Sequence, residues 1–521
     1  MGQIEFILIA LLVTVVLLAS AARAAGLPYP IVLVLGGLAL GFVPGAPKAR
    51  LPPDLVLVIF LPPLVYASAF FTSLSDLRRN LRPIGLLSIG LVLATTATVG
   101  VVAHAVVPGL SWAAAFTLGA IVGPTDAIAV GAIVRRVGLP RSIVNVLEGE
   151  SLINDGTALV AYKVAVTAAV TGAFSVASAG LHFIADAAGG IAIGLAVGYV
   201  ISEIRRRLDD PVIENTIGLL SGYAAYVPAA QAGASGVLAA VTVGVFLGFR
   251  APFIVSPSTR LQGSMMWEIL VFLLNAILFV LIGLQLPMVV HALGHRSIPR
   301  LIGYGALVAA TVIATRLVWQ QTVVHFIRAV DRRPAVRGRR VSWRVRMVVG
   351  WCGIRGAVSL AAALALPPDF PDRELLVFMT FAVILVTLIG QGLTLPRLIR
   401  ALGVVDDGDE GRAELRARLV ATKAALRRID ELGGEEWTRD DTIERLHGQY
   451  AYRKRRLAAR AGKIEDDGYE DRSVAYQTMV REVLEAQRAE LIRLRNDGTI
   501  SAGTMARLER EFDLEDERLE I

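Results

Sequence analysis

Acidic, hydroxyl and amide side chains are concentrated in the segment Glu148-Gly-Glu-Ser-Leu-Ile-Asn-Asp-Gly-Thr157. Ser151, Asn154 and Asp155 stand three and four residues apart, so they share one face if the segment is helical. Oxygen ligands of this kind suit a small, hard cation. Apolar residues follow for two turns, and a carboxylate withdrawn from water is costly in its charged form. We therefore predict that Asp155 holds either a proton or a cation, and the alternative is a structural polar cluster.

A second polar segment, Val122-Gly-Pro-Thr-Asp-Ala-Ile-Ala-Val-Gly131, lies inside an apolar run. Pro124 removes a backbone donor and disfavours helical geometry at the residue before it, so we expect an interrupted helix. The interruption frees backbone carbonyls beside Thr125 and Asp126. Thr125 and Asp126 are candidate cation ligands, and the alternative is that Asp126 only caps the second half-helix.

The third polar segment is Gly350-Trp-Cys-Gly-Ile-Arg-Gly-Ala-Val-Ser359, where three glycines flank Arg355 and predict another distorted helix. A buried arginine needs an anionic partner. Glu150 is the first choice for a structural ion pair with Arg355, and Glu148 is the second. The alternative is that Arg355 extends to the membrane surface.

These segments belong to a chain with two compositional regions. Hydrophobic residues make up 55% of the 521 residues and charged residues 19%, below the roughly 25% of soluble proteins. Residues 1–403 hold 17 of the 45 acidic residues, and the last 118 residues hold the other 28. We therefore predict a transmembrane domain over 1–403 and a soluble helical domain over 404–521.

The first domain contains about thirteen apolar runs of the length that spans a bilayer as a helix. The first is expected to be an uncleaved helix because Glu5 stands where a signal peptide has basic residues. The division between the eighth and ninth, around Pro228 to Gly233, could instead be one interrupted helix. The runs are 4–22, 29–45, 53–71, 83–105, 112–134, 146–171, 180–202, 212–228, 233–249, 266–287, 299–327, 345–366 and 374–396.

Basic loops alternate with loops poor in arginine, which by the positive-inside rule places the N-terminus outside and the C-terminus in the cytoplasm. In the seventh run, Gly190, Gly194 and Gly198 recur every four residues and predict close helix packing. We expect a multi-pass protein of a bacterial inner membrane. The basic groups that define the orientation are Arg78, Arg79 and Arg82; Arg135, Arg136 and Arg141; Arg205 to Arg207; and Arg328 to Arg346.

The predicted interruptions fall in runs five and twelve. Transporters built from two inverted repeats place interrupted helices at corresponding positions of the two halves, with the binding site at the middle of the membrane. Lys163 and Arg316 also lie inside apolar runs, where charge is expensive, and the sequence assigns them no role.

The quoted segments resemble the monovalent cation:proton antiporter family that includes the NhaP antiporters and the animal sodium/hydrogen exchangers. The resemblance covers about residues 5–400 and includes Phe60-Leu-Pro-Pro-Leu64. It implies thirteen helices in two inverted repeats, a homodimer, and Asp155 as the alternating carrier. It further implies ligands at Ser151 and Thr125, helix-positioning roles for Asn154 and Asp126, and a Glu150–Arg355 pair.

One feature departs from that pattern. Relatives often carry a carboxylate after the paired prolines of the third run, whereas this chain reads Leu64-Val-Tyr-Ala-Ser-Ala69. Tyr66 and Ser68 are the only side chains there that could offer an oxygen, and neither is assigned.

The sequence as a whole predicts an electroneutral sodium/proton antiporter for pH and sodium homeostasis, with lithium or potassium as other possible cations. A potassium/proton antiporter is the first alternative, and a cation channel gated by the C-terminal domain is the second. No catalytic set, cofactor motif or nucleic-acid-binding motif is found, so an enzyme or a nucleic-acid-binding protein is not expected.

Overall fold

The computed structural model describes residues 3–43, 58–134, 137–171, 176–293, 296–330, 341–404, 408–465 and 467–519. Within these ranges every regular element is a helix. The chain divides into two compact units, Met1–Asp406 and Asp407–Ile521, which we describe separately. The basic residues Arg135 and Arg136, and most of the group from Arg328 to Arg346, lie outside the residues whose side chains are described.

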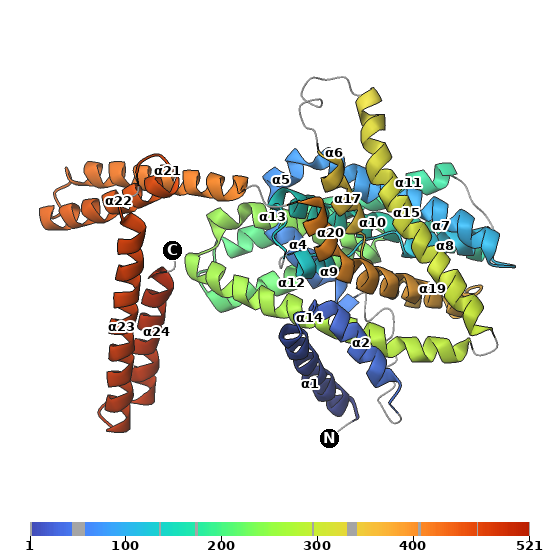
Figure 1. The fold of residues 1–521 in the computed structure, drawn as a ribbon, viewed down its shortest axis with the longest axis horizontal. Helices are drawn as coiled ribbons and strands as arrows, with labels where there is room; N and C mark the ends of the chain where they lie inside the picture. Colours follow the sequence, from blue (N-terminus) through green and yellow to red (C-terminus); the bar gives the residue numbers. More distant parts are fainter. Residues whose placement is uncertain are drawn as a thin grey trace. The chain divides into compact units, whose positions relative to one another are not determined.

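Apart from the short helix over 74–79, the helices of the first unit lie within or overlap the predicted apolar runs (Figure 1). Two π-helical segments, η1 (Leu86–Leu91) and η2 (Val386–Gln391), continue into their neighbouring helices. The α-helices are α1 (Gln3–Ala24), α2 (Tyr29–Gly41), α4 (Leu61–Phe71), α5 (Leu74–Arg79), α6 (Leu81–Gly85), α7 (Val92–Val106), α8 (Trp112–Ile121), α9 (Ala127–Val134), α10 (Arg141–Thr171), α11 (Val176–Arg205), α12 (Pro211–Gln231), α13 (Gly236–Ile254), α14 (Pro257–Ala292), α15 (Ile298–Val330), α17 (Trp343–Trp351), α18 (Ala357–Leu364), α19 (Arg373–Leu385) and α20 (Gly392–Leu402).

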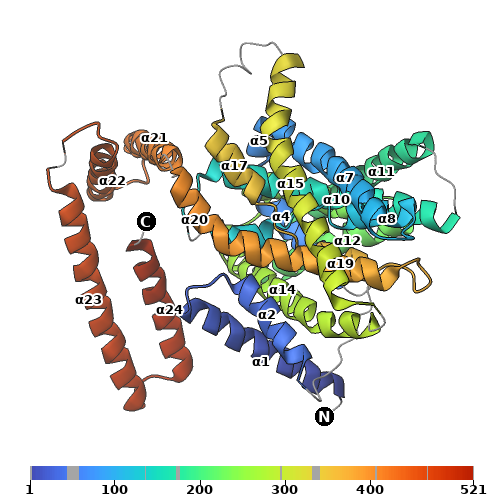
Figure 2. The same ribbon diagram turned by 45° about the vertical axis from the view of Figure 1, so that its right-hand side comes forward.

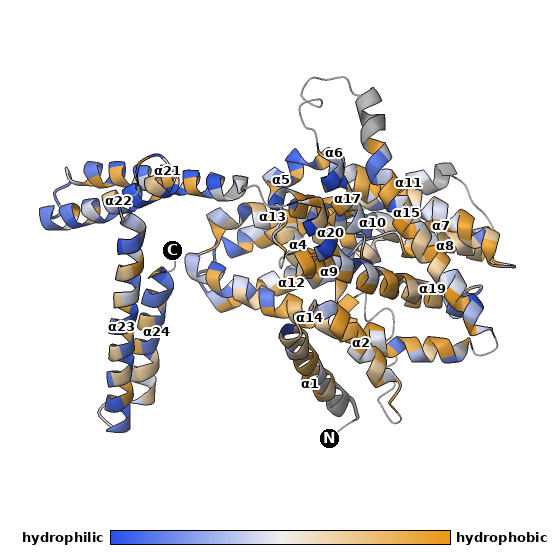
Figure 3. Cartoon of the chain, in the orientation of Figure 1, coloured by the Kyte–Doolittle hydropathy of each residue, from blue (hydrophilic) through white to orange (hydrophobic). Residues whose placement is uncertain are grey.

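The composition of these helices is that of a multi-pass membrane protein. Among the described residues, six helices are long and apolar enough to cross a bilayer, and hydrophobic residues dominate the first unit in Figure 3. The uncertain division near Pro228 is resolved, because α12 and α13 are separate helices. The predicted glycine packing is also confirmed. A Cβ on Gly190 or Gly194 would lie 2.5 or 2.6 Å from a backbone oxygen of the segment that packs against α11.

Both predicted interruptions are present. The first separates α8 from α9 over residues 122–126, and the second separates α17 from α18 over residues 352–356. The two interruptions meet, because the backbone N–H of Asp126 donates to the carbonyl of Ile354 at 2.8 Å. The polar segments of the sequence are thus brought to one place by the crossing of two interrupted helices.

The second unit consists of two helical hairpins, visible in Figures 1 and 2. The helices are α21 (Asp409–Leu432), α22 (Asp440–Arg460), α23 (Tyr469–Asn496) and α24 (Ala502–Leu519). Gly433 and Gly434 lie between α21 and α22, and Asp497 and Gly498 lie between α23 and α24. Gly498 has φ +72°, a conformation that glycine adopts without steric cost.

Candidate functional site

A cavity of about 60 Å³ lies where the first interruption meets α10. A water molecule needs roughly 10–15 Å³ of such space, so the cavity is large enough for a few waters or a partly hydrated ion. Its polar wall includes four residues from the first two sequence segments: Thr125, Asp126, Ser151 and Asp155. The remaining wall comes from α4, α9, α14 and α18, together with Pro124, Leu152 and Gly356.

Asp155 is the acidic residue of α10 on this wall, and its side chain is 8% exposed. None of the described residues donates a hydrogen bond to its carboxylate. Buried polar groups are nearly always satisfied, and an exception calls for an explanation such as a bound ion or proton. Asp155 is therefore an acidic group on this wall that is available to an occupant of the cavity.

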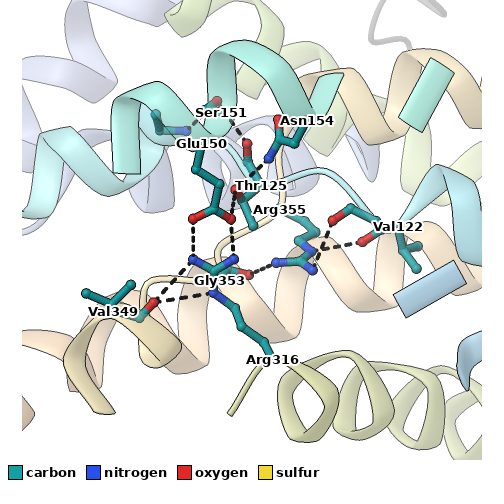
Figure 4. A network of polar contacts seen from close by, with 11 residues as sticks. Val122, Thr125, Glu150, Ser151, Asn154, Arg316, Val349, Gly353 and Arg355 are labelled. Carbon is teal, nitrogen blue, oxygen red and sulfur yellow. Dashed lines mark hydrogen bonds and ion pairs between the residues drawn. The ribbon is translucent and has the colours of Figure 1, made fainter. Parts of the chain in front are cut away.

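Ser151 and Thr125 are tied to each other across the interruption (Figure 4). The Ser151 hydroxyl donates to the Thr125 carbonyl at 3.0 Å and accepts the N–H of Ala127 at 3.3 Å. The Thr125 hydroxyl donates to Glu150 at 3.1 Å and accepts the side-chain amide of Asn154 at 2.8 Å. Both hydroxyls are thus engaged in positioning the wall, and only their remaining lone pairs can face an ion.

Asn154 does not line the cavity, although the sequence places it on one face with Ser151 and Asp155. Successive helical residues differ by about 100° in direction. Asn154 therefore faces the interruption, while Asp155 faces the cavity. The patch predicted from Ser151, Asn154 and Asp155 is therefore divided. Ser151 and Asp155 line the cavity, whereas Asn154 lies behind Thr125 and donates a hydrogen bond to it.

Asp126 caps the second half of the first interrupted helix, as one of the two sequence interpretations expects. Its Oδ1 accepts the N–H groups of Ile128 at 2.9 Å and Ala129 at 3.1 Å. The same carboxylate lies beside the start of α18, where Gly356 is the N-cap residue. Its second oxygen lies against Gly356, where a Cβ would be 1.8 Å away. One carboxylate thus stabilises the positive ends of both second half-helices.

The predicted ion pair between Glu150 and Arg355 is wrong. Arg355 is fully buried, and its guanidinium donates to the carbonyls of Val122 at 2.9 Å, Gly123 at 3.2 Å and Gly353 at 2.6 Å. The interruption after α8 leaves the first two of these carbonyls without helical partners. Arg355 therefore satisfies the negative end of α8 instead of a carboxylate.

Glu150 instead pairs with Arg316 of α15, a residue that had no role assigned from its position in the sequence (Figure 4). The pair is bidentate and both side chains are 1% exposed; Arg316 Nη2 lies 2.9 Å from Glu150 Oε2. Arg316 also donates to the Val349 carbonyl at the end of α17. The sequence feature that could have predicted this pair is the position of Arg316 in the middle of an apolar run, because a charged side chain there needs a partner.

The crossing therefore has a complete electrostatic pattern. Each negative half-helix end, at α8 and at α17, receives an arginine, and both positive ends receive Asp126. Gly353 lies between Arg316 and Arg355, and a Cβ there would be 2.6 Å from the Arg316 side chain. Glycine is required at this position because the two arginines leave no room for a side chain.

The other unassigned residues are placed as follows. Lys163 lies 3.7 Å from Asp186 of α11 and does not line the cavity. Tyr66 packs against Trp267, with ring centroids 5.4 Å apart, and is also away from the cavity wall. Ser68 is the polar side chain that α4 contributes to the wall, and two wall residues that the sequence did not single out are Asn275 and Ser359.

The fold and the site define a class: a multi-pass helical membrane protein in which two interrupted helices cross beside a small cavity that has polar side chains on its wall, the architecture of secondary transporters. The model of the transmembrane sodium/hydrogen exchanger family matches residues 7–401. The chain therefore belongs to that family of cation:proton antiporters.

Individual proteins agree with this assignment. An uncharacterized Na(+)/H(+) exchanger of Mycobacterium tuberculosis is 36% identical over 500 residues, covering 94% of this chain and 91% of that protein. A sodium, potassium, lithium and rubidium/H(+) antiporter of Bacillus pumilus is 34% identical over 71% of this chain and 58% of its own length. The fold is similar to that of the sodium proton antiporter MjNhaP1 of Methanocaldococcus jannaschii at pH 8, with a TM-score of 0.60, 20% identity, and coverage of 77% of this chain and 98% of that chain.

Proposed function

We propose that this chain exchanges sodium for protons across a bacterial cell membrane and that Asp155 carries the two in turn. The observation that supports this most directly is a buried carboxylate on a cavity wall that receives no hydrogen bond from the described residues. Such a group is stabilised by a bound proton or by a bound cation, and the two exclude each other.

The mechanism follows from that exclusion. With the cavity open to the cytoplasm, Asp155 loses its proton and binds sodium. The part of the protein that contains the crossing then shifts, sodium leaves on the outer side, and a proton takes its place. One positive charge moves each way, so the exchange is electroneutral and serves pH and sodium homeostasis.

The neighbouring residues have supporting roles in this proposal. Ser151 and Thr125 contribute oxygen ligands through the lone pairs that their hydrogen bonds leave free. Asp126 adds negative potential beside Asp155 while it caps the half-helices, and Asn154 fixes Thr125. The Glu150–Arg316 pair and Arg355 keep the two interruptions in contact.

The membrane arrangement is also part of the proposal. It has thirteen spans in two inverted repeats, the N-terminus outside, the C-terminus in the cytoplasm, and a homodimer as the assembly. The alternation of basic and arginine-poor loops supports this orientation. The unit Asp407–Ile521 is proposed as a cytoplasmic regulatory or assembly module.

Potassium is the alternative cation, because the Bacillus pumilus relative is named for sodium, potassium, lithium and rubidium. Carboxylate, hydroxyl and amide oxygens bind both sodium and potassium, so ligand chemistry alone does not separate them.

The test uses inverted membrane vesicles that contain a pH-sensitive dye. A respiratory proton gradient is established, and sodium, lithium or potassium is added in turn. The proposal predicts that added sodium collapses the proton gradient. Because the exchange is electroneutral, the rate of collapse should be the same whether or not the membrane potential is clamped. If potassium alone collapses the gradient, the transported cation is potassium and not sodium. A steady current without proton movement would identify the protein as a channel.

A further inference from the structure

Besides Ser68, two uncharged polar side chains on the cavity wall have no role in the proposed mechanism. Ser359 belongs to the first turn of α18, and Asn275 lies in the middle of α14. Both line the same cavity as Asp155, from helices other than α10.

Ser359 is 1% exposed, and its hydroxyl has no hydrogen-bond partner among the described residues. A buried hydroxyl without a partner costs free energy, and a water or an ion beside it would supply the missing interaction. The cavity is the space that could hold that partner.

Asn275 is 3% exposed and has a fixed orientation. Its Nδ2 donates to the Val271 carbonyl of its own helix at 2.6 Å. Because the nitrogen is anchored, the oxygen of the planar amide is directed away from that carbonyl. No described residue donates a hydrogen bond to Oδ1, which leaves it as an acceptor at the cavity.

We infer that the Ser359 hydroxyl and the Asn275 amide oxygen are neutral ligands that complete the cation site opposite Asp155. The inference rests on the proposed function and extends it to residues from α14 and α18. It also explains how the site can work without an acid in α4, where Ser68 is the polar side chain on the wall. Neutral ligands add coordination without adding charge, so a single carboxylate still exchanges one cation for one proton.

The test compares Ser359→Ala and Asn275→Ala with two controls. Ser88→Ala and Gln391→Leu remove buried polar groups that also lack partners but do not line the cavity. Losing one ligand is expected to raise the apparent KM for sodium about tenfold, equivalent to about 1.4 kcal/mol. The maximal rate at saturating sodium is expected to equal that of the wild type. The two controls should keep the wild-type KM for sodium, and so should Ser359→Thr, which retains the hydroxyl.

A binding measurement makes the inference independent of transport. Purified full-length protein in detergent is heated with increasing sodium, and the concentration that gives half of the stabilisation is recorded. The inference predicts that this concentration rises about tenfold in both alanine variants and is unchanged in the controls.

The outcomes are separable. An unchanged KM and an unchanged half-stabilising concentration in both alanine variants would overturn the inference, as would a fall in maximal rate alone. If the wild-type protein binds sodium but moves no protons, the proposed antiport is wrong, and the binding measurement still decides the ligands.

Discussion

The cavity wall and the crossing behind it use similar side chains in opposite ways. At the crossing, Glu150 and Arg316 form a bidentate pair, and Arg355 is satisfied by three carbonyls. On the wall, Asp155 receives no hydrogen bond from a described residue. A charged group with every partner in place holds structure, whereas one that lacks partners must obtain them from outside the protein. The difference between the two regions is therefore a difference between scaffold and carrier.

Asp155→Asn should separate the two regions most strongly. An amide cannot release a proton at physiological pH or balance the charge of a cation, so exchange should fall to the level of vesicles without the protein. The fold should remain, since no described residue depends on the Asp155 carboxylate for a hydrogen bond. The loss of exchange is measured with the pH dye, and retention of the fold is measured by thermal unfolding in detergent. Exchange at the wild-type level would show that Asp155 is not the carrier.

Glu150→Gln should have the opposite signature, with a large loss of stability. Breaking a buried ion pair leaves an unpaired charge and costs about 3–5 kcal/mol. Thermal unfolding of the purified variant measures this. Replacing both Glu150 and Arg316 by methionine is the control, because it removes the stranded charge and should recover part of the loss. A single variant that melts like the wild type would show that the pair is not structural.

Gly356→Ala tests the contact that joins the crossing to the wall. A Cβ at Gly356 would lie 1.8 Å from Asp126 Oδ2, so the carboxylate must move off the half-helix ends. Overpacking of this kind costs about 1–3 kcal/mol, and we expect lower stability together with reduced exchange. Gly303→Ala in α15 is the matched control, since no atom lies within 4 Å of its Cβ position. Equal behaviour of the two variants would argue against the Asp126 capping role.

Glu490→Gln in α23 should give the smallest effect. Glu490 is exposed, and hydrogen bonds from Arg493, one of 2.9 Å, lower the pKa of its carboxyl. A lowered pKa stabilises the fold at pH values above the unfolded value, and this contribution is lost as the pH falls through the folded value. Exchange should be unchanged, and any difference in unfolding temperature should be present at neutral pH and disappear in acid. A large loss of exchange would give this surface pair a role that its exposure does not indicate.

The sequence predicted the helices, the two interruptions and the cavity residues Asp155, Ser151, Thr125 and Asp126, because apolar runs and proline or glycine signals are local. It did not predict which arginine pairs with Glu150. Arg355 and Arg316 are equally costly in a membrane, and the choice depends on how α15 packs against the crossing. Asn275 and Ser359 were not singled out for the same reason, since a lone amide or hydroxyl in an apolar run has no local signature.

The most direct test of the account is the apparent KM for sodium as a function of pH, measured with the purified protein in proteoliposomes. If protons and sodium compete for Asp155, the KM should rise about tenfold for each pH unit on the acidic side, while the maximal rate on saturation with sodium is preserved. A sodium KM that stays constant across the same pH range would show that the two ions do not share one carboxylate, and would contradict the central claim.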